Sequence, residues 1–386
     1  NYFEISELSA KGIFLNLKKY KGETTHSLKL LIEKFKKDTL NNQKVKFKID
    51  KLNIEHGTFI YEDKIKTESK TVHLDSLNIY SKQLTFENNR LEALIENFEG
   101  QIYIPEAKTF KINTLLKYEP GELYLEDLQL MSGNNNLNGR LELLGVNRSF
   151  KNFKSKGIVN MEVFQSEWNL NTLFPENNNL KSIPALDASF VIQGGLSALK
   201  FNKIKVSNRV LDFQGHIITK NILDVNNQNI EIFTNSLLIK TKKLQQFTFI
   251  SDKVKKQLNY VSNISLEGTS TISNDSIGLN FKSKNSWGNF SINGILGNGF
   301  LDKKKSDKTF SVNADFNNLE LSRWISRELN FRLRGSIFLR GNYTNKENPI
   351  FSWKVNNSAI SSKNFALQDI AMEGRIEQSQ LRNTLS

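Results

Sequence analysis

The chain has 386 residues, of which 38% are hydrophobic and 24% are charged. This balance excludes a wholly disordered chain and a bundle of membrane-spanning helices, and the sequence has no apolar run of about 18 residues that could cross a bilayer. Cysteine is absent, which excludes disulfides, thiolate zinc sites and cysteine nucleophiles. The chain begins and ends midway through its apolar pattern, at Asn1 and Ser386, so we expect a fragment of a longer protein.

The net charge of +13 is spread unevenly along the chain. Residues 1–200 carry 27 basic and 25 acidic side chains, whereas residues 201–386 carry 26 and 15. A basic region attracts anionic lipid headgroups, acidic glycans or nucleic acid, or it only keeps the protein soluble. The sequence has no signature of an RNA- or DNA-binding module, so we expect no nucleic acid partner.

One apolar pattern occurs seven times, beginning at Phe3. Each copy has two apolar residues one position apart, a gap of two residues, and two more apolar residues one position apart. Alternate residues of a strand lie on one face, and a bulge in the double gap would return the second pair to the face of the first. We therefore predict bent strands that are apolar on one side at Phe3–Ala10, Phe47–Ile54, Val72–Ile79, Leu123–Leu130, Leu199–Val206, Ala314–Leu321 and Phe365–Met372.

The segments between these strands predict turns and a few helices. Asn-rich turns lead to second alternating strands, for example after Leu130 and after Val206, which indicates antiparallel hairpins in a meander. An amphipathic helix is predicted at His26–Lys37, and short helices at Ser251–Leu258 and Leu321–Leu329. The Asn-rich stretch 175–181 and the Lys-rich stretch 302–308 are predicted to be exposed loops.

A longer repeat overlies the strand pattern in the second part of the chain. Gly194, Gly268 and Gly341 follow similar helical and strand segments at intervals of 74 and 73 residues. Units of this kind bury their apolar faces only by stacking on their neighbours. We expect a first region over residues 1–150 and a second, built from repeats of about 74 residues, over residues 151–386.

The sequence gives little sign of catalysis. The four histidines, His26, His56, His73 and His216, have no metal-ligand spacing, and no phosphate-binding loop or nucleophile elbow occurs. The match of Ser197 and Lys200 to a Ser-x-x-Lys motif is better explained by chance. We expect no enzyme activity, no cofactor and no metal.

The apolar face is the feature that carries a function. A sheet with one apolar face either folds over and packs on itself, or it leaves that face open as a trough. The residues that we expect to line the face are Phe47, Ile49, Leu52, Ile54, Val72, Leu74, Leu77, Ile79, Leu123, Leu125, Leu128, Leu130, Leu199, Phe201, Ile204, Val206, Phe213, Phe365, Leu367, Ile370 and Met372.

The strands Leu123–Leu143 and Phe47–Ile54 resemble the repeating strands of the AsmA-like family, and within it the TamB-type translocation and assembly proteins. The opening residues Gly12–Leu15 and Tyr20–Gly22, the helix at 26–37 and the strand Lys48–Asp63 are similar to the segment after the membrane anchor of these proteins. The resemblance covers most of the chain. It does not include the anchor helix or the C-terminal domain that meets an outer-membrane barrel partner.

The resemblance implies an all-β, elongated and repeating antiparallel β-groove, a β-taco, with an apolar interior and a few short helices. It implies a periplasmic bridge in a diderm bacterium, anchored in the inner membrane, that carries phospholipids between the inner and outer membranes. The expected partners are phospholipids, the membranes at both ends, and an outer-membrane barrel assembly protein that binds regions absent here. The alternatives are a scaffold for the translocation and assembly of outer-membrane proteins, and a hydrolase or glycan-binding solenoid.

Overall fold

The computed structural model describes part of the chain and divides it into two units, Asn1–Thr172 and Leu173–Ser386. The predicted helices His26–Lys37 and Leu321–Leu329 and residues 175–181 and 302–307 lie outside the described residues. The described residues are 2–19, 46–63, 70–104, 106–146, 153–173, 182–222, 224, 227–247, 250–258, 261, 263–297, 308–320, 331–342, 350–362, 365–377 and 380–385.

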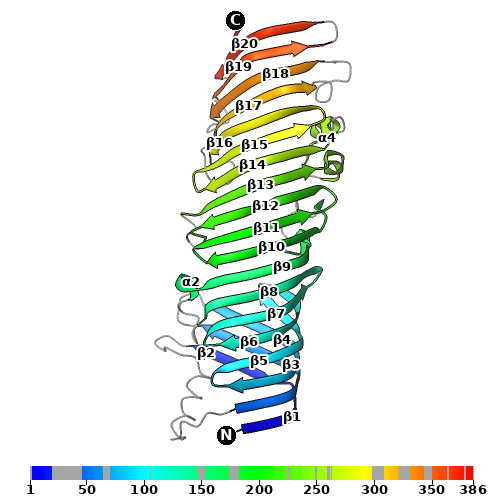
Figure 1. Cartoon of the computed structure of the whole chain (residues 1–386), viewed down its shortest axis with the longest axis vertical. Helices are drawn as coiled ribbons and strands as arrows, with labels where there is room; N and C mark the ends of the chain where they lie inside the picture. The colour runs from blue at the N-terminus through cyan, green and yellow to red at the C-terminus, as the bar shows by residue number, and fades with distance from the viewer. Residues whose placement is uncertain are drawn as a thin grey trace. The chain divides into compact units, whose positions relative to one another are not determined.

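The first unit is a sheet of nine strands that mostly follow one another as antiparallel neighbours. β1 and β2 are the exception, because both pair in parallel with β3, whereas each later strand pairs antiparallel with the next (Figure 1). The strands are β1 (Tyr2–Lys11), β2 (Phe14–Lys19), β3 (Lys46–Asp63), β4 (Lys70–Glu87), β5 (Arg90–Ile104), β6 (Glu106–Glu119), β7 (Gly121–Ser132), β8 (Asn135–Val146) and β9 (Ile158–Trp168). A four-residue helix, α2 (Phe153–Lys156), separates β8 from β9.

The second unit is an antiparallel meander of twelve strands, each hydrogen-bonded to the next in chain order. The strands are β10 (Leu186–Gly195), β11 (Ala198–Ser207), β12 (Leu211–Lys220), β13 (Asn229–Ile239), β14 (Ile264–Ser273), β15 (Ser276–Asn285), β16 (Gly288–Gly297), β17 (Thr309–Glu320), β18 (Arg332–Asn342), β19 (Ile350–Ser361), β20 (Ala366–Glu377) and β21 (Gln380–Leu385). The predicted all-β, antiparallel fold is confirmed.

The helical segments among the described residues are short. Besides α2 they are α3 (Leu170–Leu173), the 3-10 helix η2 (Thr241–Gln246) and α4 (Asp252–Leu258). The predicted helix at Ser251–Leu258 is therefore confirmed. Figure 1 shows α4 beside the ends of the strands of its unit and not over a face of their sheet.

The predicted bulges occur in five of the seven copies of the pattern. In β7, Leu125 pairs with Leu141 and Leu128 with Gly139, so β7 advances three residues while β8 advances two. The extra residue lies at Asp127, whose φ of 49° is in the left-handed region. The other four copies have their left-handed residue at the same position of the pattern, namely Ser76, Lys203, Asn318 and Asp369.

The two copies nearest the N-terminus behave differently. β1 and β3 lie side by side in parallel with their patterns in register, Phe3 opposite Phe47 and Leu8 opposite Leu52, without a shift. Between the pairs Ile49–Leu84 and Lys51–Lys82, β3 and β4 each advance by two residues, and the left-handed residue at this point is Gln83 in β4. The predicted bulge is therefore not seen as a register shift in these two copies.

Glycines accompany the bulges where neighbouring backbones approach each other. A Cβ atom at Gly139 would lie 2.2 Å from the carbonyl oxygen of Glu162, and one at Gly215 would lie 2.1 Å from that of Phe233. Glycines with a positive φ occur at Gly194 and Gly268, 74 residues apart as expected, and at Gly335, whereas Gly341, the third glycine of the expected series, does not have this conformation. Bulges and glycines allow a β-sheet to bend.

Candidate functional site: an apolar sheet face

The predicted lining residues share one face of the sheet within each unit. Residues directly opposite each other on paired strands lie on the same face. All the predicted residues except Phe365 have such partners, and every partner is apolar, glycine or serine, as in the pairs Phe47–Phe86, Leu125–Leu141 and Phe201–Ile217. The sequence pattern thus located an apolar surface that crosses several strands of each unit.

This face is only partly buried. Of the 21 predicted residues, five are buried, four are exposed and the other twelve are intermediate. The buried ones are Ile49, Leu77, Leu128, Leu199 and Ile204, and the exposed ones are Val72, Phe365, Leu367 and Met372. In a closed sandwich core, the inward residues of every strand would be covered by a facing sheet. The described residues therefore do not seal this face as a solid core.

Burial is greatest at the bulges and decreases toward the strand ends. Leu77 follows the left-handed Ser76 and is 7% exposed, whereas Val72, near the start of the same strand, is 40% exposed. Leu128 is 5% exposed, whereas Leu130, two residues nearer the end of β7 on the same face, is only partly buried. This gradient is expected of a concave face, because the two halves of each bent strand shield the residues at the bend.

Hydroxyl groups at the bends are turned to the backbone and not to the apolar surface. Thr114 Oγ1 donates a hydrogen bond to the carbonyl oxygen of Glu126 at 2.7 Å, and Thr219 Oγ1 donates to that of Leu199 at 3.2 Å. Ser358 Oγ donates to the carbonyl oxygen of Asn356 at 3.1 Å. These three side chains are at most 4% exposed, so the face stays apolar although it contains polar residue types.

The opposite face of the first unit is polar and held by ion pairs across strands. Lys82 Nζ lies 2.8 Å from Glu96 Oε1, and Lys117 Nζ lies 3.0 Å from Glu126 Oε2. The hydrogen bond from Lys117 to Glu126 raises the pKa of the lysine above its ordinary value. Exposed pairs of this kind contribute little to stability. They identify this face as the solvated one.

The pattern missed part of the apolar face. In β6, Ile112, Leu116 and Tyr118 lie opposite the lining residues Leu130, Leu125 and Leu123 of β7 but follow plain alternation without a double gap. Plain alternation of apolar residues also occurs in β14, β15, β16 and β18. A search for simple period-two alternation would have found these residues.

A small apolar core lies at the strand ends on one side of the sheet in the second unit. Val261 and Trp287 are each 1% exposed and Leu319 is 7% exposed, and Phe290 and Phe316 pack against them. Thr241 Oγ1, in η2, donates a hydrogen bond to the carbonyl oxygen of Val261 at 2.6 Å. This cluster anchors the segment between β13 and β14 at the strand ends.

The serine and lysine of the Ser-x-x-Lys match lie away from the apolar face. Ser197 is in the turn between β10 and β11, and Lys200 is an exposed residue of β11. Within the described ranges, no group of three or more His, Asp or Glu side chains is placed to hold a metal ion. Nor does any helix of the described part have the length and apolarity needed to cross a membrane.

The sequence matches no family model, no curated protein and no solved structure. The function must therefore be inferred from the residues and the geometry of the sheet.

Proposed function

We propose that this chain is part of a conduit for phospholipids, in which acyl chains move along the apolar face of the sheet. In this proposal the full-length protein is anchored in the inner membrane of a diderm bacterium and bridges the periplasm to the outer membrane. It binds phospholipids along its length and an outer-membrane barrel assembly protein through regions outside this chain. The resemblance to AsmA-like, TamB-type proteins supports this setting.

The physical need for a conduit follows from the cost of exposing acyl chains to water. Each methylene group costs about 0.8 kcal/mol, so a two-chain lipid with about 30 methylenes faces a barrier of roughly 20 kcal/mol or more. An apolar surface removes most of this cost, while the polar headgroup remains in water. Transport of this kind requires no catalytic residue.

The observation that carries the proposal is the partial exposure of the apolar face. Leu123, Leu125 and Leu130 in β7 are all intermediate in burial, although each lies between apolar partners on both neighbouring strands. The side chains of these three residues are aliphatic and carry no polar atom. A surface of this kind favours sliding of acyl chains, because it offers no directional contact that would hold a lipid in one place.

Charged substitutions on the two faces test the proposal. We expect Leu125→Asp and Phe201→Glu to reduce transfer of a labelled phospholipid between donor and acceptor vesicles at least several-fold. The matched controls Gln129→Asp and Asn202→Glu add the same charge on the polar face of the same strands and should leave transfer unchanged. Circular dichroism and urea unfolding verify that each variant is folded. Normal transfer by a folded Leu125→Asp variant would overturn the proposal.

A scaffold for assembling outer-membrane proteins is the alternative, and the edge at β1 favours it. Among the described residues β1 pairs only with β3, and Tyr2 and Phe3 on it are 54% and 51% exposed. Such an edge can accept an extended client segment by strand addition. Photo-crosslinkers at positions 125 and 201 distinguish the two functions. Lipid adducts support the conduit, and adducts with outer-membrane protein segments support the scaffold.

A further inference from the structure

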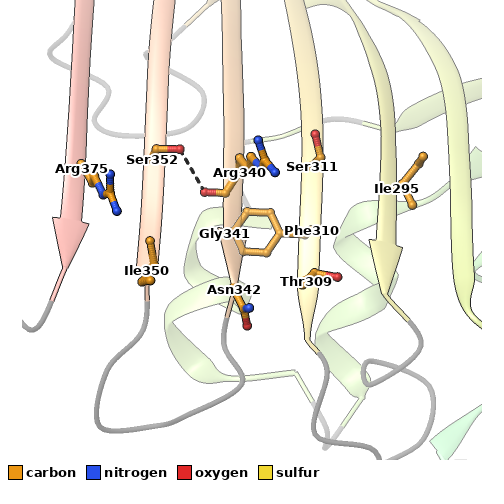
Figure 2. Close-up of a pocket in the computed structure, with 10 residues that line it drawn as sticks. All are labelled: Ile295, Thr309, Phe310, Ser311, Arg340, Gly341, Asn342, Ile350, Ser352 and Arg375. Atoms are coloured by element: carbon orange, nitrogen blue, oxygen red, sulfur yellow. Dashed lines mark hydrogen bonds between the residues drawn. The ribbon is translucent and has the colours of Figure 1, made fainter.

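A cavity of about 650 Å³ lies on the polar face of the second unit, over β16 to β20 (Figure 2). Its position follows from alternation along β18, where Leu339 pairs with apolar Val312 and Trp353, whereas the next residue, Arg340, points to the opposite face. The described residues that line it are Ile295, Thr309, Phe310, Ser311, Arg340, Gly341, Asn342, Ile350, Ser352 and Arg375.

Register brings two arginines to the same level of this cavity. Ser352 in β19 pairs with Arg340 on one side and with Arg375 on the other. Two strand spacings separate the arginine backbones, which is about 10 Å. Both residues are exposed. Figure 2 shows the Arg375 guanidinium turned toward Ser352 and the Arg340 guanidinium turned toward Ser311. Because both side chains are long, a change of rotamer at Arg340 lets the two guanidinium groups reach one small anion.

The cavity has hydrogen-bond donors but no carboxylate among its ten described lining residues. Thr309 and Ser311 supply hydroxyl groups and Asn342 supplies an amide, whereas the hydroxyl of Ser352 donates to the backbone carbonyl oxygen of Arg340 at 3.5 Å (Figure 2). Arg340 forms no ion pair with any described residue, so its charge is not neutralised within the described part of the chain. Ile295, 59% exposed, and Ile350, 40% exposed, add an apolar border.

A second cavity, in the first unit, shows that this charge pattern is not general. It measures about 250 Å³ and lies at the ends of β4 to β6. Its basic residues are matched by carboxylates: Arg90 lies 3.3 Å from Glu119, and Lys117 lies 3.0 Å from Glu126. In the cavity of the second unit, Arg340 has no such carboxylate partner among the described residues.

We propose that the cavity at Arg340 and Arg375 binds a phosphate group. Guanidinium groups match phosphate oxygens in geometry and form strong charge-assisted hydrogen bonds, and the hydroxyls supply further donors. The volume is in the range of small-ligand sites, so it also accommodates the group esterified to the phosphate. The phosphate belongs either to a soluble phosphate ester or to a phospholipid headgroup at a bilayer surface. The site lies on the face opposite the proposed acyl path, so the phosphate-binding proposal does not depend on the proposal of a lipid conduit.

Binding of inorganic phosphate and of glycerol 3-phosphate to the folded chain, measured by calorimetry, tests the proposal. We expect Arg340→Gln to weaken binding roughly tenfold, because it removes the charge-assisted bonds while keeping a polar, neutral side chain with the same first three carbons. The matched control Arg334→Gln removes an equal charge from the same strand at an exposed position outside the cavity and should change the affinity less than about twofold.

Vesicle flotation separates the two sources of the phosphate. If the protein floats with vesicles that contain phosphatidylglycerol but not with vesicles of phosphatidylcholine alone, and if this flotation requires Arg340 and not Arg334, the site binds a lipid headgroup. Binding of the two soluble phosphates without Arg340-dependent flotation assigns it to a soluble ester. Equal losses in the Arg340 and Arg334 variants would overturn the proposal, since they would show attraction by net charge alone. The proposal would also be overturned if neither soluble phosphate bound at concentrations up to about 10 mM, where a weak site is still detected, and flotation did not depend on Arg340.

Discussion

Thr114 in β6 donates a hydrogen bond of 2.7 Å from its hydroxyl to the carbonyl oxygen of Glu126 in β7, one residue before the left-handed Asp127. A bulge breaks the regular ladder and leaves backbone groups without their usual partners. The threonine supplies a substitute donor at that point. The bend in β7 is therefore stabilised from the neighbouring strand, and strand curvature depends on residues beyond the pattern itself.

The bulge hydrogen bond predicts a modest and specific stability effect. Thr114→Val keeps the shape of the side chain but removes the donor, so we expect the free energy of unfolding to fall by about 1 kcal/mol. Thr114→Ser should retain most of the stability. Thr109→Val, at an exposed position of the same strand, serves as control in urea unfolding and should have an effect within about 0.5 kcal/mol. Equal effects at both threonines would show that the bond to Glu126 is not important.

The left-handed residue of β7 predicts a sharper effect. A β-branched side chain is strained at the φ of 49° found at Asp127. We expect Asp127→Val to destabilise the chain by about 1–3 kcal/mol, whereas Gln129→Val, two residues further along the same strand, should be neutral or slightly stabilising. Urea midpoints measure both. If Asp127→Val were as stable as the parent chain, the bulge would not be fixed at this residue.

The gradient of burial predicts that lining residues divide into two classes. Leu128 is 5% exposed, so Leu128→Ala should lower the free energy of unfolding by about 2–4 kcal/mol. Leu367 is 48% exposed, and Leu367→Ala should cost less than about 1 kcal/mol. Chemical unfolding measures both changes. A large loss at Leu367 would mean that this end of the face is covered in solution.

The close approach of backbones at the bends predicts intolerance of a single methyl group. A Cβ atom at Gly215 would meet the carbonyl oxygen of Phe233 at 2.1 Å, so Gly215→Ala should destabilise by about 2 kcal/mol or more. At Gly57 the nearest atom is 3.4 Å away and the backbone is not left-handed, so Gly57→Ala should be nearly neutral. Thermal unfolding of the two variants compares them. Similar melting temperatures would contradict the proposed contact.

The carboxyl group of Asp75 predicts a dependence of stability on pH. Thr58 Oγ1 and the backbone N–H of Ser76 both donate to Asp75 Oδ1 at 2.8 Å, and these bonds hold the pKa of Asp75 below its ordinary value. Because the folded-state pKa is the lower one, the stabilisation is present above the unfolded-state pKa and is lost as the pH falls through the folded-state pKa.

The variant Thr58→Val tests this dependence. It should be less stable than the parent chain near pH 7, and the difference should shrink as the pH falls below about 3. Thr71→Val, at an exposed position of β4, should show no difference that changes with pH. Melting temperatures across this range provide the measurement, and a constant difference for Thr58→Val would count against the bond to Asp75.

The amino-acid sequence alone determined that the chain forms bent strands and which side of each strand is apolar. Alternation and the double gap predicted bent strands with one apolar face, because side-chain direction along a strand follows from local geometry. In β7, from Leu123 to Leu130, this reasoning located both the face and the bulge at Asp127. The sequence also indicated the short helix α4, from its place within the longer repeat.

Only the tertiary structure decided which partners the N-terminal strands take and which side chains the polar faces bring together. The local pattern is the same for parallel and antiparallel partners, so it could not show that β1 pairs in parallel with β3, 44 residues further along. Nor could it place Arg340 and Arg375 on either side of Ser352, because cross-strand neighbours depend on register. Register is set by turns and bulges acting over the whole sheet, and no single segment of the chain contains that information.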